Sequence, residues 1–143
     1  MMTMINLKSI LVLILAGLLV LTQQQVQSLH KDLKGGISPV PKIVVLNLDS
    51  SGYQSIFHGA PETLLFHSGL VTLQPDESAG IHNTQNYEEM IIVLEGEGQL
   101  IINKGYFQLK YGLVAYCPPH TEHNVKNTGI KPMKYIYIAV KTN

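Results

Sequence analysis

Short apolar runs separated by turn residues fill the chain after residue 28. Glu95–Gly98 (E-G-E-G) and Lys104-Gly105 stand between such runs and have the composition of hairpin turns. No apolar period of 3.6 residues persists for the length of a helix. Many short strands with regular turns predict an all-β sandwich or barrel. The strands expected in the second half of the chain lie at about 81–84, 88–94, 98–103, 106–110, 113–117, 122–127 and 133–140.

The region before these strands is also β-rich. Lys42–Leu48 (K-I-V-V-L-N-L) is one candidate strand, and a turn over 49–52 separates it from a second candidate at 53–58. Thr63–Leu73 is long enough for one strand that is interrupted at Gly69. A glycine inside a strand favours a bulge or a bend, so we expect one there.

Two of the expected strands are apolar on both faces. Met90–Leu94 (M-I-I-V-L) and Met133–Val140 (M-K-Y-I-Y-I-A-V) carry apolar side chains at odd and even positions. Successive side chains of a strand point to opposite faces, so both faces of these strands need cover. The interior of a small barrel covers one face. A second sheet or a second subunit must cover the other, and we therefore expect a homodimer.

The N-terminus has the pattern of an export signal. Residues 10–21 form an unbroken apolar run of twelve after a single lysine. A membrane span takes about 20 residues, whereas this length fits the apolar region of a secretory signal peptide. We predict a signal peptide at 1–28, a linker and N-terminal arm at 29–45 and a barrel domain at 46–143. Cleavage implies a secreted or periplasmic protein, and the alternative is an uncleaved membrane anchor.

Composition narrows the choice of partners. Ten Lys stand against ten acidic residues, so no electrostatic attraction favours nucleic acid, or a membrane once the signal is cleaved. The chain has no Arg, the residue that most often clamps carboxylates and phosphates in a bidentate way. Cys117 is the single cysteine, so no intrachain disulfide can form.

Three side chains from separate expected strands can reach one point. His82 and Glu89 lie on strands that follow each other, and His123 lies just beyond a Pro-Pro turn. Two imidazoles and one carboxylate can hold a divalent cation and leave positions open for substrate, as in non-haem iron oxygenases. The other interpretation is a polar interior in which these groups are merely hydrogen-bonded. Burying a carboxylate and two imidazoles without a cation is costly, which favours a metal site.

The spacing around these residues resembles a known motif. His82-Asn83-Thr84 is followed by four residues and Glu89, and then by six residues and Gly96. This resembles the first motif of the cupin superfamily, usually G-x5-H-x-H-x3,4-E-x6-G. Thr84 stands where the family usually has its second His. The site then keeps three ligands, recruits another group or has lost its metal.

A later stretch resembles the second cupin motif, usually G-x5-P-x-G-x2-H-x3-N. Gly112 is followed by five residues and Pro118-Pro119-His120, then by two residues and His123, and by three residues and Asn127. His120 stands where the family usually has Gly, in a position that we expect to need an unusual backbone angle. His is among the residues that tolerate positive φ, so a turn residue is the main interpretation. A replacement ligand or a substrate contact is the alternative.

The resemblance covers about residues 70–140 and implies a small jelly-roll β-barrel with a metal inside. It implies His82, Glu89 and His123 as ligands of Fe, Mn, Zn or Ni, with Thr84 and His120 as accessory groups. The implied function is an exported cupin-domain protein acting on a small organic molecule, as an oxygenase, isomerase or lyase. The alternatives are a non-catalytic binding module for a sugar-type ligand and a structural cupin with a degenerate metal site.

Four other residues receive an interpretation from their surroundings. His67 is expected to be an ordinary core or surface residue, and the face on which it lies depends on whether Gly69 forms a bulge. Tyr87 could line a pocket. Cys117 is expected to be a small buried residue, because no activating base is indicated. Asn127 is expected to close a turn with its side-chain amide.

Overall fold

The computed structural model describes residues 39–142, together with positions 23 and 25. The predicted signal peptide, apart from those two positions, lies outside the described residues, as does the first part of the linker. Pro39–Asn143 forms a compact unit of its own. In the part of the chain that is described, no helix is long and apolar enough to cross a membrane.

The described domain is all-β, which confirms the predicted fold class. Its nine strands are listed here in chain order: β1 (Gly52–Phe57), β2 (Phe66–Leu73), β3 (His82–Asn83), β4 (Tyr87–Glu95), β5 (Glu97–Ile102), β6 (Gly105–Lys110), β7 (Val114–Cys117), β8 (Glu122–Asn127) and β9 (Met133–Lys141).

One expected strand does not form. The run over 42–48 pairs with no strand, and two of its apolar side chains are almost fully exposed, Ile43 by 94% and Val45 by 85%. Residues of high β propensity become a strand only when a ladder and a buried face are available. β1 occupies the edge position of its sheet, beside β2, and the 42–48 run stays outside the ladder.

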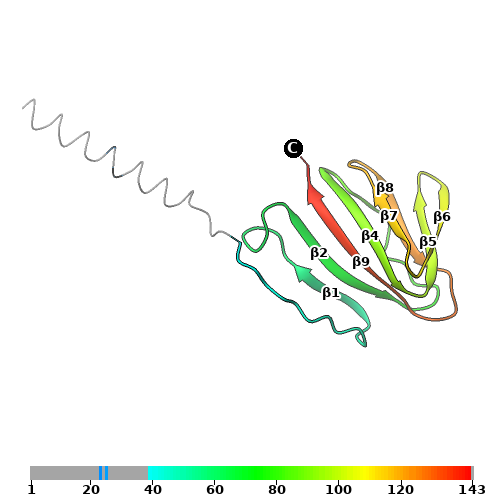
Figure 1. Cartoon of the computed structure of the whole chain (residues 1–143). Coiled ribbons are helices and arrows are strands. Elements are labelled where there is room, and N and C mark those ends of the chain that lie inside the picture. Colours follow the sequence, from blue (N-terminus) through cyan, green and yellow to red (C-terminus); the bar gives the residue numbers. More distant parts are fainter. Residues whose placement is uncertain (1–22, 24, 26–38, 143) are drawn as a thin grey trace, which may run out of the picture. The chain divides into compact units, whose positions relative to one another are not determined.

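The strands form two antiparallel sheets that face each other (Figure 1). One sheet has the order β1-β2-β9-β4-β7, and the other has the order β3-β8-β5-β6. β6 and β7 are consecutive in the chain but are edge strands of different sheets. The expectation of a closed barrel is therefore wrong in this respect: no strand ladder among the described residues joins the two sheets, and the domain is an open jelly-roll sandwich.

The hydrophobic core lies between the sheets. The odd positions of β4, such as Ile91 and Val93, point inward and are fully buried. On the outer face of the same strand Met90 is 38% exposed and Ile92 is half-buried. The second sheet thus covers one face of β4, and the other face is only partly covered. The remaining core residues are Leu73, Leu100, Leu109, Cys117, Val125, Met133 and Tyr135.

β2 runs straight through Gly69, so the expected bulge is not in this strand. Its register with β9 is regular from end to end, and the irregularity lies on β1, between Ser55 and Phe57. A Cβ at Gly69 would lie 2.5 Å from Cε2 of Tyr53 and 2.8 Å from Cε1 of Tyr137. The glycine is therefore required by the two tyrosine rings that pack over it.

Candidate metal centre

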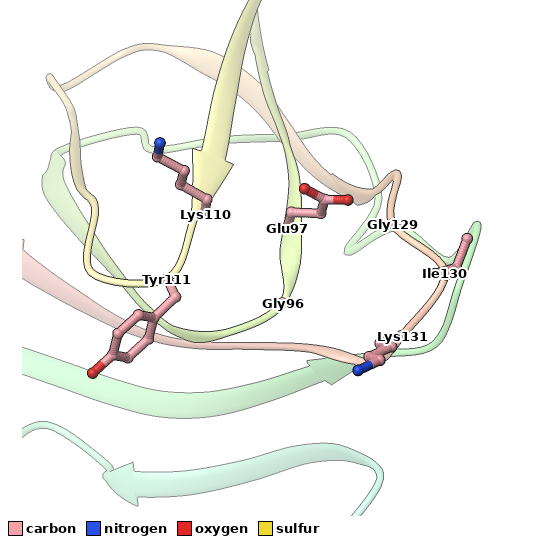
Figure 2. A pocket seen from close by; sticks show the side chains of 7 residues that line it. All are labelled: Gly96, Glu97, Lys110, Tyr111, Gly129, Ile130 and Lys131. Carbon is pink, nitrogen blue, oxygen red and sulfur yellow. The ribbon is translucent and has the colours of Figure 1, made fainter.

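One cleft of the described domain has few side chains suited to metal binding or catalysis. It measures about 610 Å³ and lies beyond the ends of β4 and β8, the ends opposite to those that carry Glu89 and His123 (Figure 2). Its polar side chains are one carboxylate, two ammonium groups and one phenol, and it contains no imidazole. The lining residues are Gly96, Glu97, Lys110, Tyr111, Gly129, Ile130 and Lys131.

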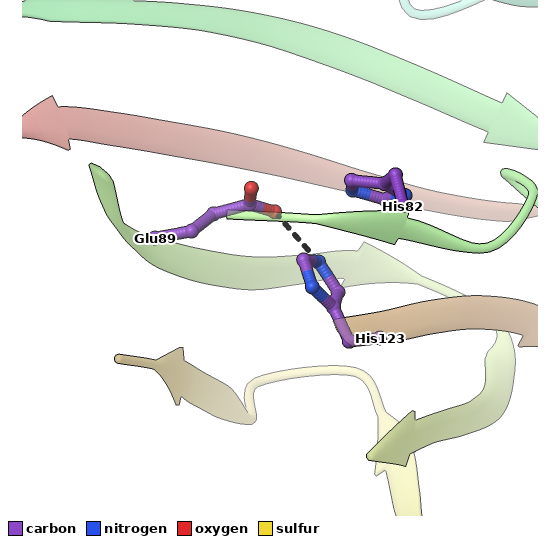
Figure 3. Close-up of side chains that lie close together, drawn as sticks. All are labelled: His82, Glu89 and His123. Carbon is purple, nitrogen blue, oxygen red and sulfur yellow. Dashed lines mark ion pairs between the residues drawn. The ribbon is translucent and has the colours of Figure 1, made fainter. Parts of the chain in front are cut away.

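The three predicted ligands meet at the other end of the sandwich. His82 on β3 lies directly opposite His123 on β8 in the antiparallel ladder, and their ring centroids are 4.2 Å apart. Glu89 reaches them from β4 in the facing sheet (Figure 3). Strand alternation puts all three on inner faces. Figure 3 shows the three side chains directed toward one another, although they come from three strands and two sheets.

The distances between the three groups suit a single cation. Nε2 of His123 lies 3.5 Å from Oε1 of Glu89, and one ligand atom from each of the three residues lies within 4.8 Å of the others. Ligand atoms at 2.0–2.2 Å from one ion stand about 3–3.5 Å from each other. Shifts of about 1 Å would bring the set to that geometry.

Backbone carbonyls orient both imidazoles. Nδ1 of His82 lies 2.8 Å from the carbonyl oxygen of Gly80, and Nδ1 of His123 lies 3.4 Å from that of Thr121. A carbonyl oxygen only accepts, so each Nδ1 carries the proton and each Nε2 keeps its lone pair. Nε2 of His123 is buried without a hydrogen-bond partner. A divalent cation would satisfy this nitrogen, so the residues present fit a metal site.

Burial and charge act on His123 in opposite directions. The residue is 2% exposed, and burial lowers the pKa of its imidazole. The carboxylate of Glu89 and the carbonyl of Thr121 raise this pKa, and together they outweigh burial, so that the net pKa lies above its ordinary value of 6.5. Without a cation, the imidazole therefore gains a proton more readily than a free histidine does.

The two predicted accessory residues lie in the surrounding turns. Thr84 follows the last residue of β3, and its hydroxyl donates to the carbonyl of Pro118 at 2.8 Å and accepts from the amide of Thr121 at 2.9 Å. These bonds tie the loop after β3 to the turn before β8. His120 is exposed and has a φ of 59°, as expected of a turn residue.

Cys117 is buried opposite Glu89 in the β4–β7 ladder. Burial, and secondarily the charge of Glu89, raise the pKa of its thiol to about 11. The thiol therefore stays protonated at neutral pH and is a weak nucleophile. This matches the interpretation of Cys117 as a small buried residue.

His67 is the residue of the site that we did not anticipate. It lines a cavity of about 250 Å³ together with two of the three predicted ligands. Because β2 has no bulge at Gly69, His67 lies on the same inner face as Val71 and Leu73. In the sequence, the odd positions 67, 71 and 73 would share one face of a regular strand. Whether the strand is regular at Gly69 could not be decided from the sequence. The other lining residues are Val71, Ala79, His82, Glu89, Val125, Tyr135 and Tyr137.

Comparison with known proteins agrees with this fold. Residues 69–139 match the sequence model of the cupin domain family. The chain therefore carries a small domain of the cupin superfamily, as its two motifs predicted. It is also 34% identical over 56 residues to the uncharacterized protein MJ1618 of Methanocaldococcus jannaschii. That match covers 39% of this chain and 45% of the relative's length.

Solved structures share the fold at low sequence identity. A cupin 2 conserved barrel domain protein from Salinispora arenicola superposes with a TM-score of 0.61 at 18% identity, over 71% of this chain and 90% of that one. A cupin protein from Bacteroides fragilis superposes with a TM-score of 0.62 at 17% identity, over 73% of this chain and 86% of that one. A predicted oxalate decarboxylase from Thermotoga maritima superposes with a TM-score of 0.52 at 18% identity, over 68% of this chain and 99% of that one. At these identities the likeness shows the fold alone.

Proposed function

We propose that the domain binds one divalent metal ion through His82, Glu89 and His123 and acts on a small organic molecule. The observation that carries this proposal is the convergence of the three side chains around a buried imidazole nitrogen without a partner. Two imidazoles and a carboxylate suit Fe, Mn, Zn or Ni, and a set of three protein ligands leaves coordination positions open.

A bound cation would supply Lewis-acid polarisation of a substrate oxygen. Groups of the chain itself would orient the ligands and balance the charge of the ion. The carbonyls of Gly80 and Thr121 hold the two imidazoles in the ligating tautomer. The carboxylate of Glu89 offsets part of the ion's charge. His82 is exposed, so the site opens to solvent on its side and small molecules can reach it. An oxygenase, an isomerase and a lyase are all consistent with this chemistry.

A binding module without catalysis is the second candidate, and a structural cupin with a degenerate site is the third. The observation in support of these two candidates is the replacement of the usual second His by Thr84. We expect chelator-treated protein to melt at a higher temperature after addition of Fe, Mn, Zn or Ni, because an ion that binds only the folded state stabilises it. A melting temperature that no metal changes would favour the second or third candidate. Oxygen consumption by the metal-loaded protein would then separate an oxygenase from an isomerase or a lyase.

Metal affinity should fall steeply on acidification. The metal needs a neutral His123, whose pKa is raised above 6.5 in the absence of metal. At pH 5.5 a proton occupies this nitrogen, and we expect affinity at least about tenfold lower than at pH 7.5. The folding stability of the metal-free protein should change with pH in the opposite direction and be higher at low pH. Its raised pKa contributes stability below pH 6.5 that is lost as the pH rises through the folded-state value.

Melting curves at the two pH values, with and without metal, check this prediction. The increase in melting temperature caused by metal should be large at pH 7.5 and small at pH 5.5. An equal increase at both pH values would mean that protons do not compete for these ligands.

We propose further that two chains form a homodimer through the outer face of β4 and β7. Met90 and Tyr116 are neighbours in that ladder, and Val114 lies on the same face. They are 38%, 58% and 60% exposed. An apolar patch beside a sheet edge is suited to association with a second copy.

Light scattering during size-exclusion chromatography should give the mass of a dimer for the wild type. Val114→Glu should give a monomer, because the dimer would bury an unpaired charge. Tyr106→Glu, at an exposed position of the other sheet, is the matched control and should remain a dimer. A monomeric wild type would contradict the proposal.

Export remains a proposal that rests on the apolar run at 10–21. N-terminal sequencing of protein recovered from outside the cytoplasm should begin at Leu29. A start at Met1 in a membrane fraction would point to the uncleaved anchor instead.

A further inference from the structure

The imidazole of His67 is held by aromatic rings and not by hydrogen bonds. Its ring meets that of Tyr87 edge-on at a centroid distance of 5.2 Å and that of Tyr137 at 5.8 Å. Within residues 39–142, no protein group hydrogen-bonds to either of its nitrogens. The side chain is half-buried and lines the same cavity as two of the predicted metal ligands, His82 and Glu89. An imidazole that lines a cavity and has no hydrogen-bond partner in the protein is suited to contact a bound molecule.

Register puts His67 in line with the metal centre. In the five-stranded sheet His67 pairs with Ala139 on β9, and Ala139 pairs in turn with Glu89 on β4. All three point to the inner face. Strands lie about 4.8 Å apart, so His67 and Glu89 are about 10 Å apart at their Cα atoms. The residue between them, Ala139, has only a methyl group, and both His67 and Glu89 line the cavity in which a ligand could lie.

Tyrosines and small apolar residues form the walls of this cavity. Tyr135 and Tyr137 line it. The ring of Tyr137 stacks at 6.3 Å on that of Tyr53, which is not a lining residue, and their hydroxyls lie 3.1 Å apart. Burial, with the hydrogen bond to Tyr53, raises the pKa of Tyr137, so its hydroxyl stays neutral. No Lys lines the cavity and the chain has no Arg, so the charge of an anionic ligand would be compensated by a metal ion or by a protonated imidazole.

The dimensions of the cavity limit the size of the ligand. A volume of about 250 Å³ corresponds to about eight water molecules in the liquid, at about 30 Å³ each. This suits a molecule of one ring with small substituents. The flat faces of the aromatic residues favour a planar ring.

We propose that this cavity binds a planar single-ring molecule, which reaches the metal through an oxygen at one end and accepts or donates a hydrogen bond at the other end to His67. The inference rests on the proposed metal site and deepens it by naming the class of molecule. His67 is a positioning residue in this scheme, since it fixes the orientation of the ring and holds its far end away from the metal. Tyr87 and Tyr137 keep the imidazole directed at the ligand.

Two probes that differ by one hydroxyl test the proposal. The carboxylate of benzoate and of 4-hydroxybenzoate can reach the metal, but only 4-hydroxybenzoate offers a group to His67. Isothermal titration of zinc-loaded protein should give about five- to tenfold tighter binding of 4-hydroxybenzoate. His67→Phe keeps a ring between Tyr87 and Tyr137 but has no nitrogen. It should bind both probes with equal affinity.

The outcomes separate this inference from the metal proposal. Zinc content and zinc affinity should be the same in the wild type and in His67→Phe. A wild type that binds zinc but shows no preference for 4-hydroxybenzoate, or a preference that survives in His67→Phe, would overturn the inference and leave the metal site standing. A wild type that takes up no zinc would overturn both. His67→Gln, which restores a hydrogen-bonding group, should recover part of the preference.

Discussion

Replacing His123 with Ala should lower the affinity for a divalent cation by more than about 100-fold. Loss of a group that merely orients a ligand costs about 10- to 100-fold, and loss of the ligand itself should cost more. His123 is also the most buried of the three and has the nitrogen without a partner. Its removal leaves Glu89 and His82 as two ligands from facing sheets, with an empty space where the third stood. Titration of chelator-treated protein with zinc measures the effect.

Glu122→Gln is the matched control for this variant. Glu122 precedes His123 on β8 and points to solvent, so its loss should leave zinc affinity within about twofold of the wild type. The melting temperature of metal-free His123→Ala must be compared as well, because a large-to-small change in a buried position creates a cavity. Wild-type affinity in folded His123→Ala would exclude this histidine as a ligand.

Replacing Asn127 with Ala should destabilise the fold by about 3–5 kcal/mol. Its side chain is fully buried and satisfies three backbone groups, two in the β8–β9 turn and one at the end of β2. The amide nitrogen donates to the carbonyls of Leu73 and Lys131 at 2.9 and 2.8 Å, and the amide oxygen accepts from the N–H of Gly129 at 2.9 Å. Each buried group that loses its partner costs about 1–3 kcal/mol. Urea denaturation of the metal-free protein measures the difference.

Asn124→Ala provides the comparison within the same strand. The amide oxygen of Asn124 is buried without a hydrogen-bond partner, so its removal breaks no bond to that atom. We expect a change below about 1 kcal/mol. If the two variants were equally stable, the hydrogen bonds of Asn127 would not be what holds the turn.

That His82, Glu89 and His123 lie close together could be predicted from strand alternation and from the spacing of the two motifs. Strand alternation and the lengths of the turns fix which side chains point inward, and the two motifs preserve those lengths. The direct pairing of His82 with His123 could not be predicted in this way, because it joins two strands that are far apart in the sequence. Asn127 was also correctly interpreted, since an asparagine at the end of a strand often closes the turn with its side-chain amide.

The features that depend on long-range pairing could not be predicted. The 42–48 run has strand propensity, but whether it pairs depends on what occupies the sheet edge. Thr84 has the parity of His82, and a continuing strand would put both on one face. β3 ends at Asn83, however, and the hydroxyl of Thr84 is engaged by the turn before β8. The place of His67 could not be predicted either, because a bulge at Gly69 would have put its side chain on the outer face of the sheet and a regular strand puts it on the inner face.

Elemental analysis of the untagged, purified protein tests the central claim most directly. Inductively coupled plasma mass spectrometry of the wild type, and of His123→Ala prepared in the same way, measures the metal that each carries. We predict about one divalent ion per wild-type chain and close to none in the variant. Wild-type protein that is folded and free of metal, even after incubation with Fe, Mn, Zn or Ni, would contradict the account.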